Sequence, residues 1–358
     1  MKLTRRVACS LMLAFGASVS AQPMAGGMID DDQKVPDLEY LIEQSQDLLP
    51  FARTETGKAY LNATEHLPKQ LRRYLWVDRL FNVAYTEASY ADLEDARKRN
   101  LRFRPVTELA YYMATEERPL LDVLPLDLAV HGTELADPAA LAGKKILLYN
   151  PRVITQGRLL ASLGAEVTVL HTQVRLKELY SQPGDVGTAE GAEGFPDGSL
   201  KLIYKDWPSE DSEELGEDFD LIIVSNWLSR GLSLSSESPP RWNRAARPMR
   251  ATESTPDELL TGFAERLAPG GRFIVYAYGP MQPRAPAHSP PTANVRMPFS
   301  YEALEESGLE IVALDMDDSQ SVLYASRAID DFDKPMLNRE GVPQMTSAYT
   351  LLAKPAAE

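Results

Sequence analysis

The sequence contains a single cysteine, Cys9, among 358 residues. One cysteine cannot form an intrachain disulfide, so the fold has to be stabilised by its hydrophobic core. Histidine is almost as scarce, and His66, His131, His171 and His288 do not have the spacing of metal ligands. These absences argue against a disulfide-bonded scaffold and against a zinc site.

The sequence also lacks an apolar run of the roughly 20 residues that a membrane-spanning helix needs. Residues 7–18 are apolar or small, they follow a basic head at Lys2, Arg5 and Arg6, and they precede small residues up to Ala21. This pattern is typical of a signal peptide, whereas a membrane anchor would need a longer run. We expect residues 1–21 to be removed on export, no membrane span, and a periplasmic or secreted protein that has no thiol.

Positive charge is in short supply. The 37 Lys and Arg residues face 52 Asp and Glu residues, so the formal net charge is −15, and removal of the three cations in residues 1–21 makes it −18. An acidic protein of this kind is disfavoured as a general binder of nucleic acid or anionic membranes. We expect no nucleic-acid partner, and any cluster of cations on this background stands out.

Residues 22–140 are expected to form a mainly helical N-terminal region. Apolar residues recur at spacings of three and four over residues 71–85, which predicts an amphipathic helix there. The aromatic residues of the region either line a ligand cleft or pack in the core. They are Tyr74, Trp76, Tyr85, Tyr90, Tyr111 and Tyr112.

From residue 141 onward the pattern changes to short apolar strands that alternate with helical stretches. This alternation predicts a parallel sheet covered on both faces. The expected strands are 145–149, 166–170, 200–204, 220–224 and 272–278, the expected helices are 156–163, 256–267 and 300–307, and the expected closing strands are 310–314, 322–327 and 348–353.

Five segments in this half follow one another in a recognisable order. They are residues 145–171, residues 219–226, the Pro-Gly-Gly turn with its strand at 267–275, residues 298–312 and residues 349–354. In this order they resemble class I S-adenosylmethionine-dependent methyltransferases. The resemblance implies an α/β fold over residues 141–358, a Rossmann-like methyltransferase sheet with helices on both faces, preceded by the helical region.

The cofactor loop departs from the pattern of that family. The resemblance implies an acidic residue at the end of the first strand and then Gly-x-Gly-x-Gly, but Leu148, Asn150, Arg152 and Ile154 occupy those positions. Side chains there fill space that a ligand needs beside bare backbone. At the end of the second strand, where the family binds both ribose hydroxyls with a carboxylate, this chain has His171. Each lost hydrogen bond costs about 1–3 kcal/mol, so we expect no bound cofactor, or S-adenosylmethionine if the protein is catalytic.

Two positions keep residues that the resemblance would use. Asp206, after the third strand, can face an adenine amino group, and Asn226 lies where the fourth strand opens into the active site. The alternatives are a solvated turn carboxylate and a cap at the end of a strand. Together with Asn150, Arg152 and His171, these residues are the candidates for contact with a cofactor.

Two loops that should leave the carboxyl end of the sheet concentrate arginine. The first has arginines at every third position, a spacing that suits an extended polyproline-type helix, and guanidinium groups bind carboxylate or phosphate in two-pronged pairs. The second loop, 279–298, contains no acidic residue. The loops either bind an anionic ligand or partner, or are solvated and pair with the acidic surface. The arginines are Arg241, Arg244, Arg247, Arg250 and Arg284.

The sequence therefore predicts an exported, methyltransferase-like pseudoenzyme that binds an anionic small molecule or a protein partner. The alternative is an active methyltransferase with an atypical cofactor site. A third reading is an interaction protein that has no small ligand.

Overall fold

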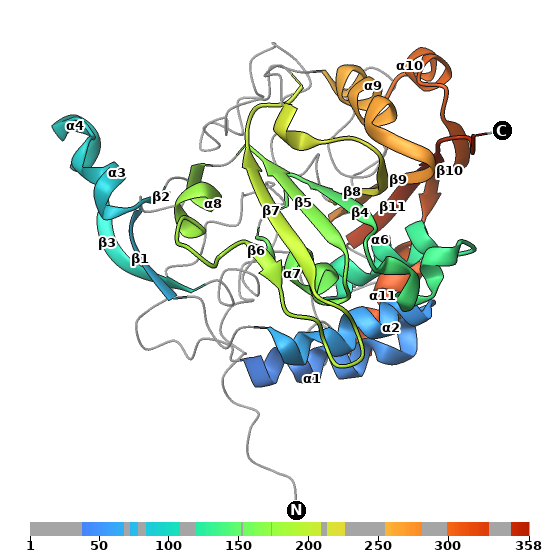
Figure 1. The fold of residues 1–358 in the computed structure, drawn as a ribbon, viewed down its shortest axis with the longest axis horizontal. Coiled ribbons are helices and arrows are strands. Elements are labelled where there is room, and N and C mark those ends of the chain that lie inside the picture. The colour runs from blue at the N-terminus through green and yellow to red at the C-terminus, as the bar shows by residue number, and fades with distance from the viewer. Residues whose placement is uncertain are drawn as a thin grey trace, which may run out of the picture.

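The structure is a computed structural model that describes residues 38–67, 72–77, 84–107, 119–151, 153–172, 174–208, 213–225, 255–280, 299–328 and 345–357. A large sheet of eight strands lies at its centre, and helices pack on both faces of that sheet (Figure 1). A small sheet of three strands lies beside it.

The elements alternate between strand and helix over most of the C-terminal half. The strands are β1 (Arg72–Val77), β2 (Ala84–Tyr85), β3 (Arg102–Thr107), β4 (Lys145–Tyr149), β5 (Glu166–His171), β6 (Gly187–Ala189), β7 (Gly198–Tyr204), β8 (Phe219–Ser225), β9 (Leu267–Pro280), β10 (Glu310–Asp317) and β11 (Met345–Ala353). The α-helices are α1 (Leu38–Leu48), α2 (Glu55–Asn62), α3 (Glu87–Ala91), α4 (Asp95–Lys98), α6 (Pro119–Val130), α7 (Thr155–Ser162), α8 (Val174–Leu179), α9 (Pro256–Arg266), α10 (Tyr301–Glu306) and α11 (Ser319–Ala328).

The large sheet has the strand order β10-β11-β9-β8-β4-β5-β7-β6. Its central strands β7, β5, β4, β8 and β9 run parallel, whereas β11 is antiparallel to both β9 and β10. The parallel strands are covered on both faces, so near-continuous apolar runs such as residues 145–149 form them. This is the Rossmann-like methyltransferase sheet that the sequence predicted, and the predicted fold class is confirmed.

Alternate side chains of the central strands β4 and β9 enter two separate cores. Tyr149 and Phe273 lie on the face that α9 covers, where they pack with Phe263. Ile146 and Ile274 lie on the opposite face, which packs against α2, α6 and α7. The two-residue alternation of a strand thus sorts the apolar residues between two helical layers.

The N-terminal region packs directly on the large sheet. The guanidinium of Arg272, in β9, donates hydrogen bonds to the carbonyl oxygens of Ala129 (2.9 Å) and His131 (2.8 Å), at the end of α6. Most of the described residues of this region are helical, in α1, α2, α3, α4 and α6 together with the short 3-10 helices Leu49–Phe51, Ala63–His66, Glu134–Ala136 and Pro138–Leu141, as the sequence predicted.

The amphipathic helix expected over residues 71–85 is wrong, because β1 and β2 occupy that segment. In β1, Leu75 and Val77 are buried while Tyr74 is exposed. Such alternation is the period of a strand, and β1 pairs with β3 in a register that puts Trp76 opposite Phe103. The apolar residues of this segment fit both periods, and pairing with β3 decided between them.

The closing strand expected over residues 322–327 is also wrong, because α11 occupies that segment. Val322 and Ala325 are buried at a spacing of three, and Tyr324 between them is exposed. One buried side suits a helix that packs on the sheet. The strand that completes the sheet is β11, which lies between β9 and β10.

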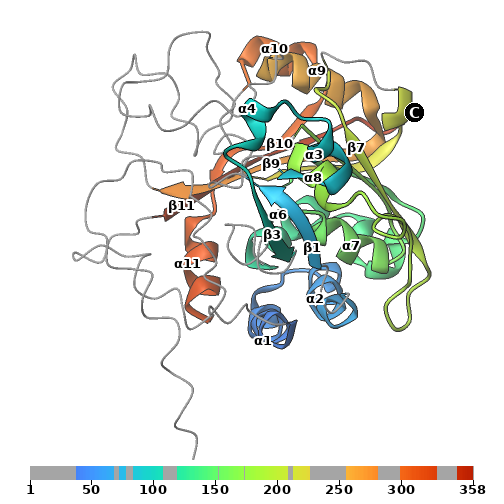
Figure 2. The same ribbon diagram turned by 90° about the vertical axis from the view of Figure 1, so that its left-hand side faces the viewer.

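The small sheet packs against α8, the helix that follows β5 in the chain (Figure 2). Glu178, in α8, accepts hydrogen bonds from the backbone N–H of Thr86 (3.0 Å) and the hydroxyl of Ser89 (2.9 Å). Arg73, in β1, forms a partly buried ion pair with Asp185, in the loop after α8. These contacts attach the small sheet to the large one.

Candidate functional site

The carboxyl ends of β4, β5, β7 and β8 meet at one edge of the large sheet. Strand β4 pairs with β5 on one side and with β8 on the other, so the chain leaves β4 in one direction and later returns on its opposite side. Ligands of open α/β sheets bind outside the carboxyl ends of the strands at such a switch point. We therefore take this edge as the candidate site.

Asn150 follows β4 and takes the place of the first glycine of the family loop. Its φ of 54° lies in the left-handed region, which glycine adopts easily and asparagine adopts more readily than most residues. Its backbone N–H donates to the carbonyl of Leu170 (2.6 Å), which ties the turn to β5. The backbone thus keeps a glycine-like turn although the side chain is an amide.

The amide oxygen of Asn150 is buried and has no hydrogen-bond partner within the described structure. The residue is 5% exposed. A buried acceptor without a partner costs about 1–3 kcal/mol, a cost that a ligand with an N–H or O–H group would remove. Asn150 is therefore the residue at this edge that points most directly to a ligand.

Ile154, in the place of the third family glycine, does not lie in open space. Its side chain is fully buried in the core beneath α7, and its backbone N–H donates to the hydroxyl of Tyr180 (3.4 Å). The side chain that replaces a glycine hydrogen here adds to the core. Arg152, in the place of the second glycine, lies outside the described residues.

His171 ends β5 and is fully buried. Its ring lies 5.5 Å from the ring of Tyr204, the residue with which it pairs at the end of β7. The Nζ atom of Lys177 lies over the same Tyr204 ring, 5.4 Å from its centroid. The position that the family uses for a ribose-binding carboxylate thus holds an imidazole enclosed beside an aromatic ring. Neutral imidazole offers one donor and one acceptor, so it cannot accept from two hydroxyls.

Asp206 lies near the hydroxyl of Tyr149. Burial raises the pKa of Tyr149 well above its ordinary range, and the negative charge of Asp206 raises it further. The ring of Tyr149 packs edge-on against Phe263 and Trp207, with centroids 5.2 Å and 6.4 Å away. Asp206 therefore lies close to Tyr149, whose ring packs in the core that α9 covers.

Ser225, the last residue of β8, was missed by the sequence reasoning. Leu148 pairs with Ile223, so two residues further on Asn150 comes level with Ser225 on the neighbouring strand. The hydroxyl of Ser225 is buried, and among the described residues it has no hydrogen-bond partner. The sequence feature that could have indicated Ser225 is a polar residue at the end of an apolar strand. Ser225 directly precedes the predicted Asn226, which lies outside the described residues.

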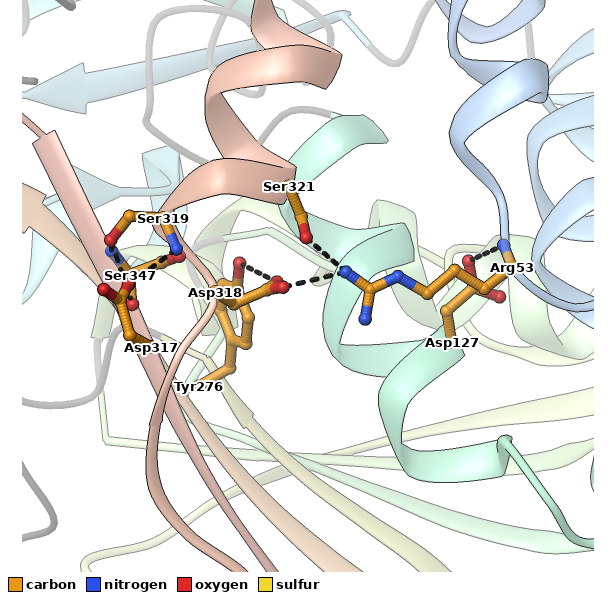
Figure 3. Close-up of polar contacts among 8 residues, drawn as sticks. All are labelled: Arg53, Asp127, Tyr276, Asp317, Asp318, Ser319, Ser321 and Ser347. Atoms are coloured by element: carbon orange, nitrogen blue, oxygen red, sulfur yellow. Dashed lines mark hydrogen bonds and ion pairs between the residues drawn. The ribbon is translucent and has the colours of Figure 1, made fainter.

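A charged network that the sequence did not indicate lies further along the same edge (Figure 3). Tyr276 pairs with Ser225 across β8 and β9, and its hydroxyl donates to the carboxylate of Asp318 (3.2 Å). Arg53 donates to the other oxygen of Asp318 (2.8 Å) and to the hydroxyl of Ser321. Burial, with the Asp318 charge, raises the pKa of Tyr276 far above its ordinary range, so this phenol stays a donor.

The edge therefore presents a row of polar groups that crosses the switch point, with Tyr276, Ser225, Asn150, His171 and Tyr204 in order. Such a row can position a ligand through hydrogen bonds. The described residues contain no cluster of three or more His, Cys, Asp or Glu that could hold a metal ion. The predicted arginines Arg241, Arg244, Arg247, Arg250 and Arg284 lie outside the described residues.

No helix in the described part of the chain is long and apolar enough to cross a membrane. The residues of the predicted signal peptide fall outside that part.

No family model matches the chain, and no curated protein is similar to it. Among similar solved structures, the 4+2 cyclase SpnF is 15% identical over 66% of this chain and 81% of its own, with a TM-score of 0.37. Phosphoethanolamine N-methyltransferase 2 of Haemonchus contortus, in complex with S-adenosyl-L-methionine, is 9% identical over 79% and 68% of the two chains, with a TM-score of 0.38.

The N-methyltransferase NodS of Bradyrhizobium japonicum, in complex with S-adenosyl-L-homocysteine, is 11% identical. The match covers 65% of this chain and 85% of that chain, with a TM-score of 0.33. The fold class of this chain rests on the order and direction of its own strands.

Proposed function

We propose that the protein is a non-catalytic binding protein, a pseudoenzyme with the methyltransferase fold, that holds its ligand at the carboxyl edge of the large sheet. The observation that carries this proposal is His171, fully buried at the end of β5. The resemblance requires a carboxylate there to bind two ribose hydroxyls. A buried imidazole beside Tyr204 lacks the two anionic acceptors, so the ordinary cofactor pose loses its ribose contact.

The polar groups beside His171 support a different ligand. The amide oxygen of Asn150 and the hydroxyl of Ser225 are adjacent acceptors at the switch point. The loops after Ser225 and Pro280 begin at this same edge, and they contain the arginines predicted to bind carboxylate or phosphate. A small anionic molecule that also carries hydrogen-bond donors fits this combination.

An active methyltransferase with an atypical cofactor pose is the second candidate. The left-handed turn at Asn150 favours it, because the backbone keeps the conformation for which the family uses glycine. In that case S-adenosylmethionine would be the cofactor. Asn150 and Asp206 would then be its contacts within the described residues.

Titration calorimetry separates the two candidates. Wild-type protein is titrated with S-adenosylmethionine, with S-adenosylhomocysteine and with a panel of small carboxylates and phosphates. We expect an anionic compound to bind and the two nucleosides to give no heat. Asn150→Gly, which removes the amide and keeps the turn, should weaken binding about tenfold, whereas Ser181→Ala, at an exposed serine, should not.

A dissociation constant near micromolar for S-adenosylmethionine would overturn the non-catalytic candidate and support the active methyltransferase. A protein partner in place of a small ligand predicts a different pattern. Arg244→Glu combined with Arg247→Glu would then abolish capture of the partner, while no compound in the panel binds.

We also propose that the protein is exported to the periplasm or secreted, because of the basic head and apolar run in residues 1–18. The protein recovered from intact cells should begin at Gln22. A chain that retains Met1 in the cytosol would contradict export, and it would give the protein access to the cytosolic cofactor supply.

A further inference from the structure

The segment between β2 and β3 forms an arm of two short helices, α3 and α4, on the outer side of the molecule (Figure 2). The backbone N–H of Thr86 and the hydroxyl of Ser89 donate to Glu178 of α8, so the base of this arm is fixed. Both helices lie wholly within the described residues, and neither contains a buried side chain. Helices of five and four residues are marginal in water without burial. A further contact would therefore stabilise the arm, residues 87–99.

A group of aromatic rings adjoins the arm. Trp76 pairs with Phe103 across β1 and β3, so both rings lie on one side of the small sheet, and Tyr74 stacks on Phe103 with centroids 5.6 Å apart. Tyr90 of α3 stacks on Trp76 at 3.8 Å, which puts the arm on the same side. Tyr74 and Phe103 are 54% and 53% exposed. We call these four residues the aromatic surface.

The other side of the small sheet packs on the protein. Leu75 and Val77 are buried in the core that contains Leu176 of α8. Arg104 and Arg102 are their partners on β3, so these two arginines belong to the inner side and not to the aromatic surface. The aromatic surface and the arm are left to face outward together.

Charge changes sign once along the arm. Residues 87–95 contain four acidic residues and no cation, and residues 97–99 are three consecutive cations. All seven are exposed except Lys98, which lies over the ring of Tyr90 at 5.3 Å. The arm is thus close to neutral, whereas the whole chain has a net charge of −15. Its charged residues are Glu87, Asp92, Glu94, Asp95, Arg97, Lys98 and Arg99.

We propose that the arm and the aromatic surface form an interface between two copies of the chain. A two-fold dimer brings the same surface of each copy together, so that surface has to be complementary to itself. With the two arms antiparallel, the acidic part of each arm faces the cations of the other. Complementary charges of this kind fix the register of an interface, and aromatic side chains are enriched at its core.

The charges of the arm argue against other occupants. An anionic membrane or a nucleic acid would meet four carboxylates beside the cations, and a strongly basic partner would meet three cations. A second copy matches both groups at once. Two copies of so acidic a chain repel one another over most of their surface, so the near-neutral arm is where they can approach.

The test is the mass of the protein recovered from cells, measured by sedimentation velocity at roughly 100 μM, above the micromolar Kd of a weak interface. We expect a dimer. Glu94→Lys combined with Asp95→Lys, and Arg97→Glu combined with Arg99→Glu, should each weaken it about tenfold or more, because like charges then face each other. An equimolar mixture of the two variants should restore the dimer, since each arm again meets its complement.

A separate pair of variants tests the aromatic surface. Tyr74→Ser combined with Phe103→Ser should also weaken the dimer about tenfold. The matched control is Tyr301→Ser combined with Tyr324→Ser, which removes tyrosines that are 67% and 54% exposed on α10 and α11. Circular dichroism and the melting temperature of each variant establish that it is folded.

A monomeric wild type would overturn the proposal. A dimer that survives the charge reversals or the loss of Tyr74 and Phe103 would do the same, because its interface would lie elsewhere. A mixture of the two charge variants that stays monomeric, or an equal loss in the Tyr301 and Tyr324 control, would also overturn it. None of these outcomes depends on the ligand of the large sheet.

Discussion

The Nη2 atom of Arg53 lies 2.8 Å from Oδ1 of Asp318, and the two residues are 265 positions apart in the chain. This ion pair connects the segment between α1 and α2 to the start of α11, across the edge of the large sheet (Figure 3). Asp318 is buried and Arg53 is about one-third exposed. The contact therefore joins the N-terminal region to the last part of the fold.

Replacement of Arg53 by methionine should lower the free energy of unfolding by about 1–3 kcal/mol. The cause is the buried carboxylate of Asp318, which would lose its cationic partner and keep Tyr276. Urea denaturation measures the change. Lys58→Met is the matched control, since Lys58 pairs with Glu55 on the surface, where such pairs contribute well under about 1 kcal/mol; equal losses would contradict the prediction.

Asp127 should make stability depend on pH. Burial raises its pKa above the ordinary value of 3.8, although the backbone N–H groups of Arg53 and Thr54 donate to it. The folded state then keeps a proton that the unfolded state has lost. The contribution of Asp127 to stability therefore falls as pH rises from about 3.8 through the raised pKa, and is constant above it.

Asp127→Asn should lack that slope, while being less stable overall because an amide N–H would face backbone donors. The measurement is the difference in unfolding free energy between wild type and variant across this pH range. A difference that does not change with pH would show that Asp127 titrates alike in the folded and unfolded states.

Gly57→Ala should destabilise the protein by about 3 kcal/mol, although alanine ordinarily strengthens a helix. A Cβ atom at Gly57 would lie 2.1 Å from Oδ1 of Asp127, a side chain held by three hydrogen bonds. Thermal or urea unfolding gives the value. In an Asp127→Ala background the same change should cost far less, and strict additivity of the two changes would refute the clash.

Asn150→Ala should be less stable than Asn150→Gly by about 1–2 kcal/mol, because a left-handed φ is costly for alanine. Asp218, with a φ of 60° in an exposed turn, offers the matched pair of variants. The same difference is expected there. The Ala and Gly variants at Asn150 should both weaken ligand binding at the edge, and those at Asp218 should not. Equal stabilities of the two Asn150 variants would contradict the turn geometry.

Much of the fold was predictable because the apolar residues of the C-terminal half suit a single period. Residues 145–149 and 220–224 are short apolar runs bounded by polar residues, and both are central strands. The helix predicted over residues 71–85 was wrong because the apolar residues there fit two periods. They recur at spacings of three and four, and Leu75 and Val77 also fit the two-residue period of a strand. The choice between strand and helix depended on β3, which lies 25 or more residues further along the chain.

The candidate site was predictable in part. The resemblance led to Asn150 and His171, which the structure places at neighbouring strand ends, and the burial of Asn150 could not be read from its sequence position. Asp206 lies near Tyr149, whose ring packs in the core under α9. Ser225 and Asp318 were missed, because a serine that ends a strand and an aspartate in an acidic run have no distinctive local pattern.

The sequence by itself determined which segments become buried strands and the acidic character of the chain, because these properties belong to local composition and spacing. Only the tertiary structure decided that Arg53 meets Asp318, that Asn150 comes level with Ser225, and that the aromatic rings of β1 and β3 gather on an outer face. Each of these is a contact between residues distant in the chain, formed when burial of apolar side chains brings separate elements together.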